Sequence, residues 1–178
     1  MATTSPGANR ATAAKGRKTT AASGSKTDAL TLLSEDHKDV DKLFKQYAKL
    51  AKAGAEGDER LAIAQQLCEM LTVHATIEEE LFYPALRDAL DDDDLLDEAE
   101  VEHASVKDLI AQIEAMDADD DLYDAKVTVL GEYVTHHVKE EEEEIFPKTR
   151  KAGLDLDDIG QQLEQRKSEL MADGAATE

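Results

Sequence analysis

Two histidines in the sequence are each followed four residues later by a glutamate: His74 by Glu78 and His137 by Glu141. Residues four apart on a helix project about 40° from each other, so an imidazole and a carboxylate at this spacing can reach one point. Imidazole nitrogens and carboxylate oxygens are common protein ligands for first-row transition metals. The spacing therefore indicates a metal site that is supported by helices.

The composition favours helices, because the chain has only three prolines and nine glycines among 178 residues. We expect long helices at about 28–53, 59–90, 95–116 and 122–151, the second interrupted near Pro84, and an amphipathic helix at about 157–171. Short connections make consecutive helices antiparallel neighbours. The predicted fold class is all-α, an up-down-up-down four-helix bundle with a short C-terminal fifth helix packed outside it.

Each of the four long helices carries an apolar stripe at spacings of three and four residues, and each stripe includes one histidine. These histidines are His37, His74, His103 and His137. A single histidine on an apolar face is usually a packed core residue, but one on each of four helices indicates a shared site. The second and fourth stripes also include glutamates. An unpaired buried carboxylate costs several kcal/mol, so a bound cation is expected.

The chain contains an internal repeat. "HATIEEELFYPALR" (74–87) aligns with "HVKEEEEEIFPKTR" (137–150), and "HKDVDKLFKQ" (37–46) aligns with "HASVKDLIAQ" (103–112). The sequence therefore predicts two related helical hairpins whose pseudo-two-fold packing brings both His-Glu sets to one centre.

The repeat and the helical angle select one residue from the run of five glutamates. Glu141 faces the centre and has Glu78 as its equivalent, whereas Glu144 lies on the inner face a further turn away. Residues one and two positions beyond Glu141 point outward, at about 140° and 120° from His137. We expect a solvated surface for these glutamates and their equivalents: Glu79, Glu80, Glu142 and Glu143. His136 is expected at the surface or beside the site.

Four imidazoles and two carboxylates are too many ligands for one four-coordinate zinc ion. Nitrogen and oxygen donors without a thiolate suit iron or manganese, and two metals that share the carboxylates use all six residues. A ferritin-like carboxylate protein is the alternative, but it needs two Glu-x-x-His motifs, and only Glu100-x-x-His103 occurs.

The ligand set, with "EEELFYP" and "EEEEEIFP", resembles the hemerythrin-like (HHE cation-binding) family over about residues 27–151. The resemblance implies a non-heme centre of two iron ions inside the bundle. It implies that Glu78 and Glu141 bridge the irons, with these metal ligands: His37, His74, Glu78, His103, His137 and Glu141. It also implies that the protein binds or senses oxygen, peroxide or nitric oxide. Peroxide-reducing activity is left open.

One position departs from the oxygen-carrying members of that family. They have a second histidine one turn after the third-helix histidine, where this chain has Lys107. One iron is therefore expected to keep an open or water-filled position, which favours chemistry or sensing over simple carriage. Asp41, the repeat equivalent of Lys107, is either an additional ligand or a surface residue.

Charge and composition limit the partners. The net charge is −21, although residues 1–26 form a basic tail without acids, which we interpret as flexible, with attraction to nucleic acid or organellar targeting as alternatives. The acidic remainder makes nucleic-acid binding an unexpected main function. A metal-free acidic bundle that acts as an interaction module is the alternative function. The expected divisions are the tail, a hemerythrin-like domain at 27–151, and a C-terminal helix and tail at 152–178.

The location of the protein is predicted from two features. No run of 18 apolar residues occurs, so no membrane association is expected. The single cysteine, Cys68, excludes an intramolecular disulfide and fits a reducing, cytoplasmic compartment. We expect Cys68 to pack in the core.

Overall fold

The computed structural model describes residues 1–2, 27–90 and 93–175, and every regular element in these ranges is a helix. The basic tail predicted at 1–26 lies almost entirely outside the described residues. The prediction of an all-helical protein is confirmed for the part of the chain that is described.

The first helix, α1 (Ala29–Ala53), begins and ends with clear signals. The Asp28 side chain accepts a hydrogen bond from the Thr31 backbone N–H at 3.1 Å, which satisfies one of the free donors of the first turn. Gly54 ends the helix in the left-handed region, with φ at 66°. The limits predicted from the sequence, 28–53, agree to within one residue.

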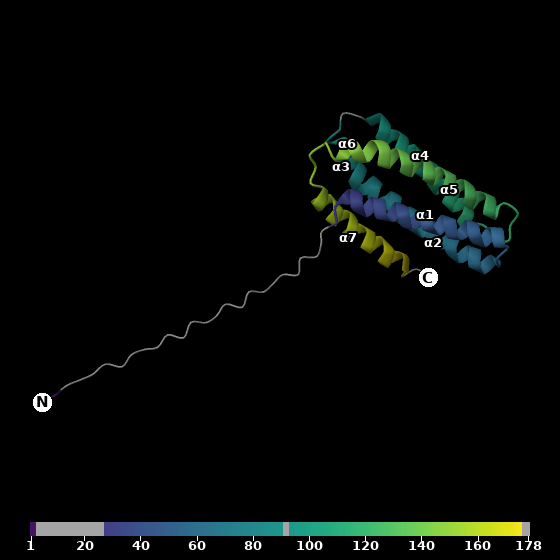
Figure 1. The fold of residues 1–178 in the computed structure, drawn as a ribbon, viewed down its shortest axis with the longest axis horizontal. Coiled ribbons are helices and arrows are strands. Elements are labelled where there is room, and N and C mark those ends of the chain that lie inside the picture. The colour runs from purple at the N-terminus through teal and green to yellow at the C-terminus, as the bar shows by residue number, and fades with distance from the viewer. Residues whose placement is uncertain (3–26, 91–92, 176–178) are drawn as a thin grey trace.

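The remaining helices form two interrupted rods, one further long helix and a C-terminal helix. The first interrupted rod consists of α2 (Gly57–Ile77), a π-helical turn η1 (Glu78–Phe82) and α3 (Tyr83–Arg87). The long helix α4 (Asp93–Glu114) follows it. The second interrupted rod consists of α5 (Tyr123–Glu140), the π-helical turn η2 (Glu141–Ile145) and α6 (Phe146–Thr149), and the C-terminal helix is α7 (Leu156–Ala175). Figure 1 shows the long helices side by side, with α1 against α2 and α5, and α4 against α5 and α2. Helix α7 lies along the outside of α1 and α2.

Both π-helical turns begin at a glutamate predicted to be a ligand. The Tyr83 N–H donates to the Glu78 carbonyl, and the Phe146 N–H donates to the Glu141 carbonyl. Pro84 and Pro147 come immediately afterwards. A proline has no N–H to donate, and its ring clashes with the carbonyl four residues earlier in an α-helix. The wider turn relieves this conflict, and π-turns of this kind are frequent at functional sites.

Each π-turn shifts the buried face of the helix by one residue. A regular stripe on the second helix predicts Leu81 and Ala85 as core residues, but Phe82 and Leu86 are the fully buried ones. The predicted inner position of Glu144 is also wrong, because that side chain is exposed. The extra residue in the turn causes both differences.

The core is divided into two apolar clusters by a polar layer. One cluster lies toward the α1 C-terminus and includes Tyr47, Leu67 and Leu130. The other lies toward the π-turns and includes Leu33 and Phe82. Between them lies the layer of histidines and glutamates that the sequence predicts as ligands.

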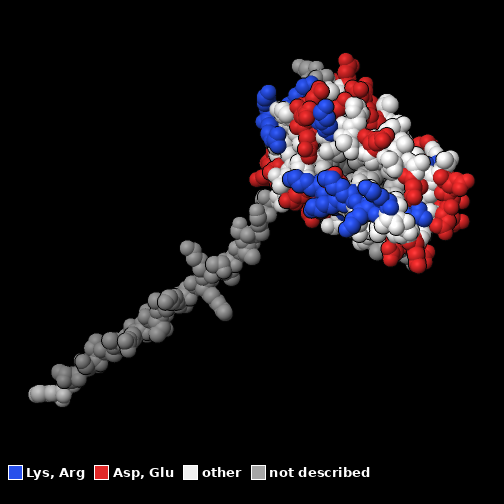
Figure 2. Space-filling model, turned by 45° about the vertical axis from the view of Figure 1, so that its right-hand side comes forward, with Lys and Arg blue, Asp and Glu red and all other residues white. Residues whose placement is uncertain are grey.

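The surface is mainly acidic but not uniformly so. Figure 2 shows Lys and Arg side chains gathered in a band on one face, with acidic side chains around it. Helix α1 carries exposed lysines at spacings of three and four residues: Lys38, Lys42, Lys45, Lys49 and Lys52. None of the helices searched within the described residues is long and apolar enough to cross a membrane.

Candidate metal centre

The structure brings the six predicted ligands together in two groups. In the first group, the His37 Nε2 lies 3.2 Å from the His74 Nε2 and 3.2 Å from Glu141 Oε2. The His74 Nε2 lies 3.3 Å from Glu78 Oε1. These four side chains, from α1, α2 and the two π-turns, offer ligand atoms that lie within 4.8 Å of one another.

The second group is built from α4, α5 and the same π-turn glutamate. The His103 Nε2 lies 3.0 Å from the His137 Nε2 and 3.4 Å from Glu78 Oε2. Glu78 thus faces both groups, one oxygen toward each. Glu141 is grouped only with His37, His74 and Glu78, so its bridging role stays a prediction.

The glutamates at the centre are buried without hydrogen-bond partners. Glu78 is 0% exposed and Glu141 is 1% exposed, and none of their four carboxylate oxygens has a hydrogen-bond partner. A buried polar group without a partner carries its full desolvation penalty, and this penalty is largest for a charged group. Metal ions placed among these oxygens and the histidine nitrogens would remove it, so the residues present fit a metal centre.

A carboxylate lies beside the outer nitrogen of every histidine in the layer, and three of the four nitrogens are at hydrogen-bond distance from it. Three of the distances from Nδ1 to a carboxylate oxygen are short: 3.0 Å from His37 to Glu142, 3.0 Å from His103 to Glu79, and 2.8 Å from His137 to Glu102. The fourth, from His74 to Asp36, is 3.5 Å, and the His74 Nδ1 has no hydrogen-bond partner. A proton held on Nδ1 leaves the Nε2 lone pair directed inward, as metal ligation requires.

This arrangement corrects the prediction that Glu79 and Glu142 are only solvated surface residues. Both side chains are partly exposed, but each orients a buried imidazole. The solvated interpretation is right for Glu143, which is exposed, and Glu80 pairs at the surface with Arg166. The repeat could have revealed this role, because Glu79 and Glu142 are equivalent positions and each directly follows a predicted ligand.

Two more orienting residues were missed in the sequence analysis. Asp36 and Glu102 are repeat equivalents that directly precede His37 and His103, yet each holds the histidine of the neighbouring helix. Contacts between helices of this kind depend on packing, so helical angle alone does not reveal them. Asp36 also forms a very short contact with Lys167 of α7.

The two residues whose role the sequence left open lie outside the ligand groups. Asp41 pairs at 2.5 Å with Lys45 on the exposed face of α1, so it is a surface residue. The Lys107 amine lies 2.5 Å from Glu79, the carboxylate that holds His103. Lys107 therefore reaches the centre only through Glu79.

In the absence of metal, the surroundings shift the pKa values of the two central glutamates in opposite directions. Burial, followed by the nearby charge of Glu141, raises the pKa of Glu78 well above its usual range. Burial would also raise the pKa of Glu141, but the ion pair with His37 and the charges of the other histidines lower it to about 2. Burial and the neighbouring His137 lower the pKa of His103 to about 3, so its imidazole stays neutral and able to bind a metal.

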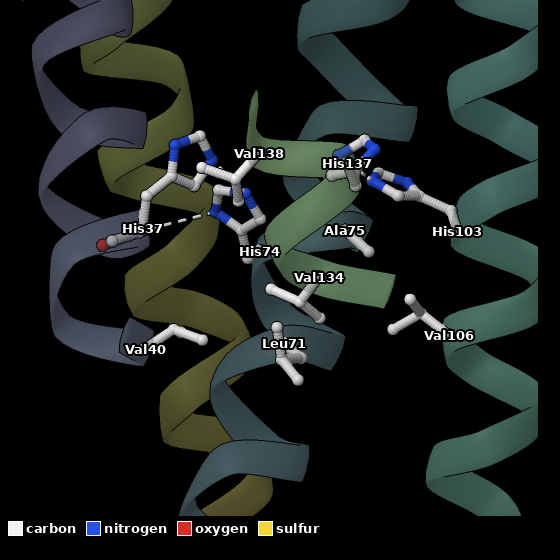
Figure 3. Close-up of a pocket in the computed structure, with 11 residues that line it drawn as sticks. His37, Val40, Leu71, His74, Ala75, His103, Val106, Val134, His137 and Val138 are labelled. Atoms are coloured by element: carbon white, nitrogen blue, oxygen red, sulfur yellow. Dashed lines mark hydrogen bonds and ion pairs between the residues drawn. The ribbon is translucent and has the colours of Figure 1, made fainter. Parts of the chain in front are cut away.

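A small apolar cavity adjoins the histidine layer. Its volume is about 20 Å³, enough for one water-sized molecule. Figure 3 shows the four histidines along one side of this space and aliphatic side chains on the other, including Val40, Leu71, Val106 and Val134. On the opposite side of the layer, the buried Tyr83 hydroxyl lies 3.5 Å from the His103 Nε2.

Comparisons with known proteins agree with this geometry. The Hemerythrin HHE cation binding domain matches residues 28–149, which is most of the chain. The chain therefore belongs to the hemerythrin HHE cation-binding family, and the resemblance seen in the sequence is confirmed. No curated protein matches the sequence significantly.

The fold is also similar to a solved structure. The crystal structure of a hemerythrin HHE cation binding domain-containing protein from Mycobacterium kansasii superposes with a TM-score of 0.71 at 22% sequence identity. The match covers 84% of this chain and 91% of that one. At this identity the comparison supports the shared fold alone.

Proposed function

We propose that this chain is a non-heme di-iron protein that binds or senses oxygen, peroxide or nitric oxide. The observation that carries the proposal is the pair of ligand groups that share Glu78, whose two oxygens point to different groups without hydrogen-bond partners. An up-down-up-down arrangement of the four long helices would place one histidine from each helix in this layer. Such a centre would supply redox chemistry toward a small oxygen- or nitrogen-containing ligand.

The donor set supports iron over zinc. The layer offers four imidazole nitrogens and two carboxylates without a thiolate, and a structural zinc site would use only four ligands. Each imidazole is oriented by an acidic side chain, an arrangement that raises the basicity of a metal-bound histidine. Manganese fits the same donors, so metal analysis has to distinguish the two.

The two metal positions are unequal in their ligands. His37, His74, Glu78 and Glu141 surround the first, whereas Glu78, His103 and His137 surround the second. Lys107 stands where a further histidine would complete the second group, and its amine is held by Glu79. We therefore expect the position near His103 to keep room for an exogenous ligand.

The size of the neighbouring cavity favours small ligands. A volume of about 20 Å³ with an aliphatic lining accepts a molecule about as large as water and disfavours larger or charged substrates. This agrees with a diatomic gas or peroxide.

The alternative of a metal-free acidic interaction bundle receives less support. Such a protein would bury two glutamates without partners and gain nothing from the four oriented histidines. A solvated acidic surface requires neither feature.

Metal analysis combined with visible absorption tests the proposal. Protein purified aerobically from iron-replete cells should contain about two irons per chain and show a ligand-to-iron absorption band. A colourless protein with one zinc ion, or with no metal, would overturn the di-iron assignment.

A further inference from the structure

A third cluster of metal-binding side chains lies on the surface near the histidine layer. It consists of Glu102 on α4 and His136 and Glu140 on α5. The His136 Nε2 lies 3.4 Å from Glu102 Oε1 and 3.2 Å from Glu140 Oε1. One ligand atom from each of the three residues lies within 4.8 Å of the others.

The internal repeat gives this cluster an informative counterpart. Asp36 and Glu102 are equivalent positions, and each uses one oxygen to face the Nδ1 of a buried histidine. The other oxygen of Asp36 contacts the Lys167 ammonium, so a positive charge compensates this carboxylate.

Glu102 has a different environment on its second side. Its second oxygen faces His136, beside another carboxylate, Glu140. Glu79 resembles Asp36 and differs from Glu102 in this respect, because its second oxygen contacts the Lys107 ammonium. A cation would therefore fit the position between Glu102 and Glu140.

We propose that Glu102, His136 and Glu140 form an accessory site for a divalent transition-metal cation, distinct from the buried centre. One imidazole and two carboxylates suit Zn²⁺, Mn²⁺ or Fe²⁺. The His136 side chain is 62% exposed, so water completes the coordination and the ion exchanges with the solvent. The cation compensates the charge of Glu102, as the Lys167 ammonium compensates that of Asp36.

The accessory site is connected to the buried centre through a single carboxylate. Glu102 Oε2 accepts from the His137 Nδ1 at 2.8 Å, while Oε1 faces the proposed cation. A cation on Oε1 withdraws electron density and makes Glu102 a weaker acceptor for His137. A cation bound at the accessory site therefore changes how strongly His137 donates to a metal in the buried centre. This coupling rests on the proposed function, whereas the accessory site does not.

Zinc binding to the protein in its purified, metal-containing state tests the accessory site. Equilibrium dialysis against Zn²⁺ should give one more zinc per chain for the wild type than for His136→Ala or Glu140→Gln. These substitutions should lower the affinity for that additional zinc ion by about tenfold or more. Glu143→Gln is the matched control, because Glu143 is an exposed glutamate on the same helical rod, and it should bind zinc like the wild type.

The difference between wild type and variant decides the result whatever the buried centre holds. If His136→Ala and Glu140→Gln bind as much zinc as the wild type, the accessory site does not exist and His136 only lies at ion-pair distance from the two glutamates. The di-iron proposal is decided separately, by the iron content before zinc is added.

The coupling has its own readout in the same experiment. Zinc should shift the iron absorption band of the wild type and of Glu143→Gln, but leave that of His136→Ala unchanged. Zinc that binds without any spectral shift would overturn the coupling and leave the accessory site established. Iron measured after dialysis checks that zinc has not displaced the inner metal.

Discussion

Each histidine in the buried layer depends on a pair of neighbours, one at each ring nitrogen. The His37 ring lies between Glu141 at Nε2 and Glu142 at Nδ1, two consecutive residues of one π-turn. The glutamate run therefore contains four environments: a carboxylate paired with His136, a buried oxygen donor, a carboxylate that orients a histidine, and exposed surface residues. All five residues are glutamates, so the role of each one depends on its angular position around the helix.

Alanine substitutions in the run should separate three of these environments. Glu141→Ala removes a predicted ligand of the proposed di-iron centre, and the variant should lose most of the iron and its absorption band. Glu142→Ala frees the His37 Nδ1 and should weaken metal affinity by about 10–100-fold. Glu143→Ala should change only surface charge, within about 0.5 kcal/mol of stability.

Iron content and affinity measured for the three variants check this order. Their backbone environments are similar, so each serves as a control for the others. Equal iron loss in all three would mean that the run acts as a diffuse negative charge. In that case the assignment by angle would be wrong.

Cys68 is a residue whose predicted environment is confirmed. It is 2% exposed in the apolar cluster, and burial, followed by the charge of Glu114, raises the pKa of its thiol to about 12. The reactive thiolate is therefore scarce at pH 8. We expect negligible reaction of the native protein with a thiol-specific reagent and complete reaction in denaturant. Rapid labelling of the folded protein would contradict this burial.

At the scale of the helices, the C-terminal helix α7 is part of the site's support. Lys167 contacts Asp36, and Arg166 pairs with Glu80 at 2.7 Å. Gly160 allows α7 to approach the start of α1, because a Cβ there would lie 2.4 Å from the Thr27 carbonyl oxygen. The family match ends at residue 149, before this helix begins.

Gly160→Ala should therefore displace α7 from α1. We expect a loss of about 1–3 kcal/mol in unfolding free energy, as is typical of overpacking. Gly174→Ala is the matched control in the same helix. The nearest atom to its added Cβ is a Glu69 side-chain oxygen at 3.5 Å, so it should be neutral or slightly stabilising. Denaturant unfolding of both variants measures the difference, and equal stabilities would contradict the close contact.

The helices and most of the site could be predicted from the sequence because both depend on local periodicity. The stripes containing His37, His103 and His137 agree with the buried face observed. The shift from Leu81 to Phe82 could not be predicted, because a constant angular step does not include a π-turn. The pairing of Asp36 with Lys167, 131 residues away, depends on how α7 packs.

At the scale of the whole molecule, the layer of histidines and glutamates separates two apolar clusters and connects all four long helices. Without a cation, the carboxylate oxygens of Glu78 and Glu141 stay buried without hydrogen-bond partners, and the layer becomes the weakest part of the core. Metal binding and folding stability should therefore be linked.

Removal of the metal should lower the melting temperature clearly. A metal present at a thousandfold excess over its Kd contributes about 4 kcal/mol, or roughly 8–16 °C for a chain of this size. Thermal melts before and after chelation measure the change. Glu141→Ala is the control, because a variant that has already lost metal should not respond to chelator. An unchanged wild-type melt would show that the layer needs no metal to be stable.

The π-turns make the number of residues in the glutamate run a separate constraint from their identity. His74 is ten residues from Pro84, and His137 is ten residues from Pro147, with a π-turn inside each interval. Because the π-turn contains one residue more than an α-helical turn, deleting one exposed glutamate should return it to an α-helix and keep Ile145 and Phe146 on the buried face. Inserting a residue should instead rotate both side chains out of the core by about 100°. The run should therefore tolerate changes of residue type, or the loss of one residue, at its exposed positions but not a gain in length.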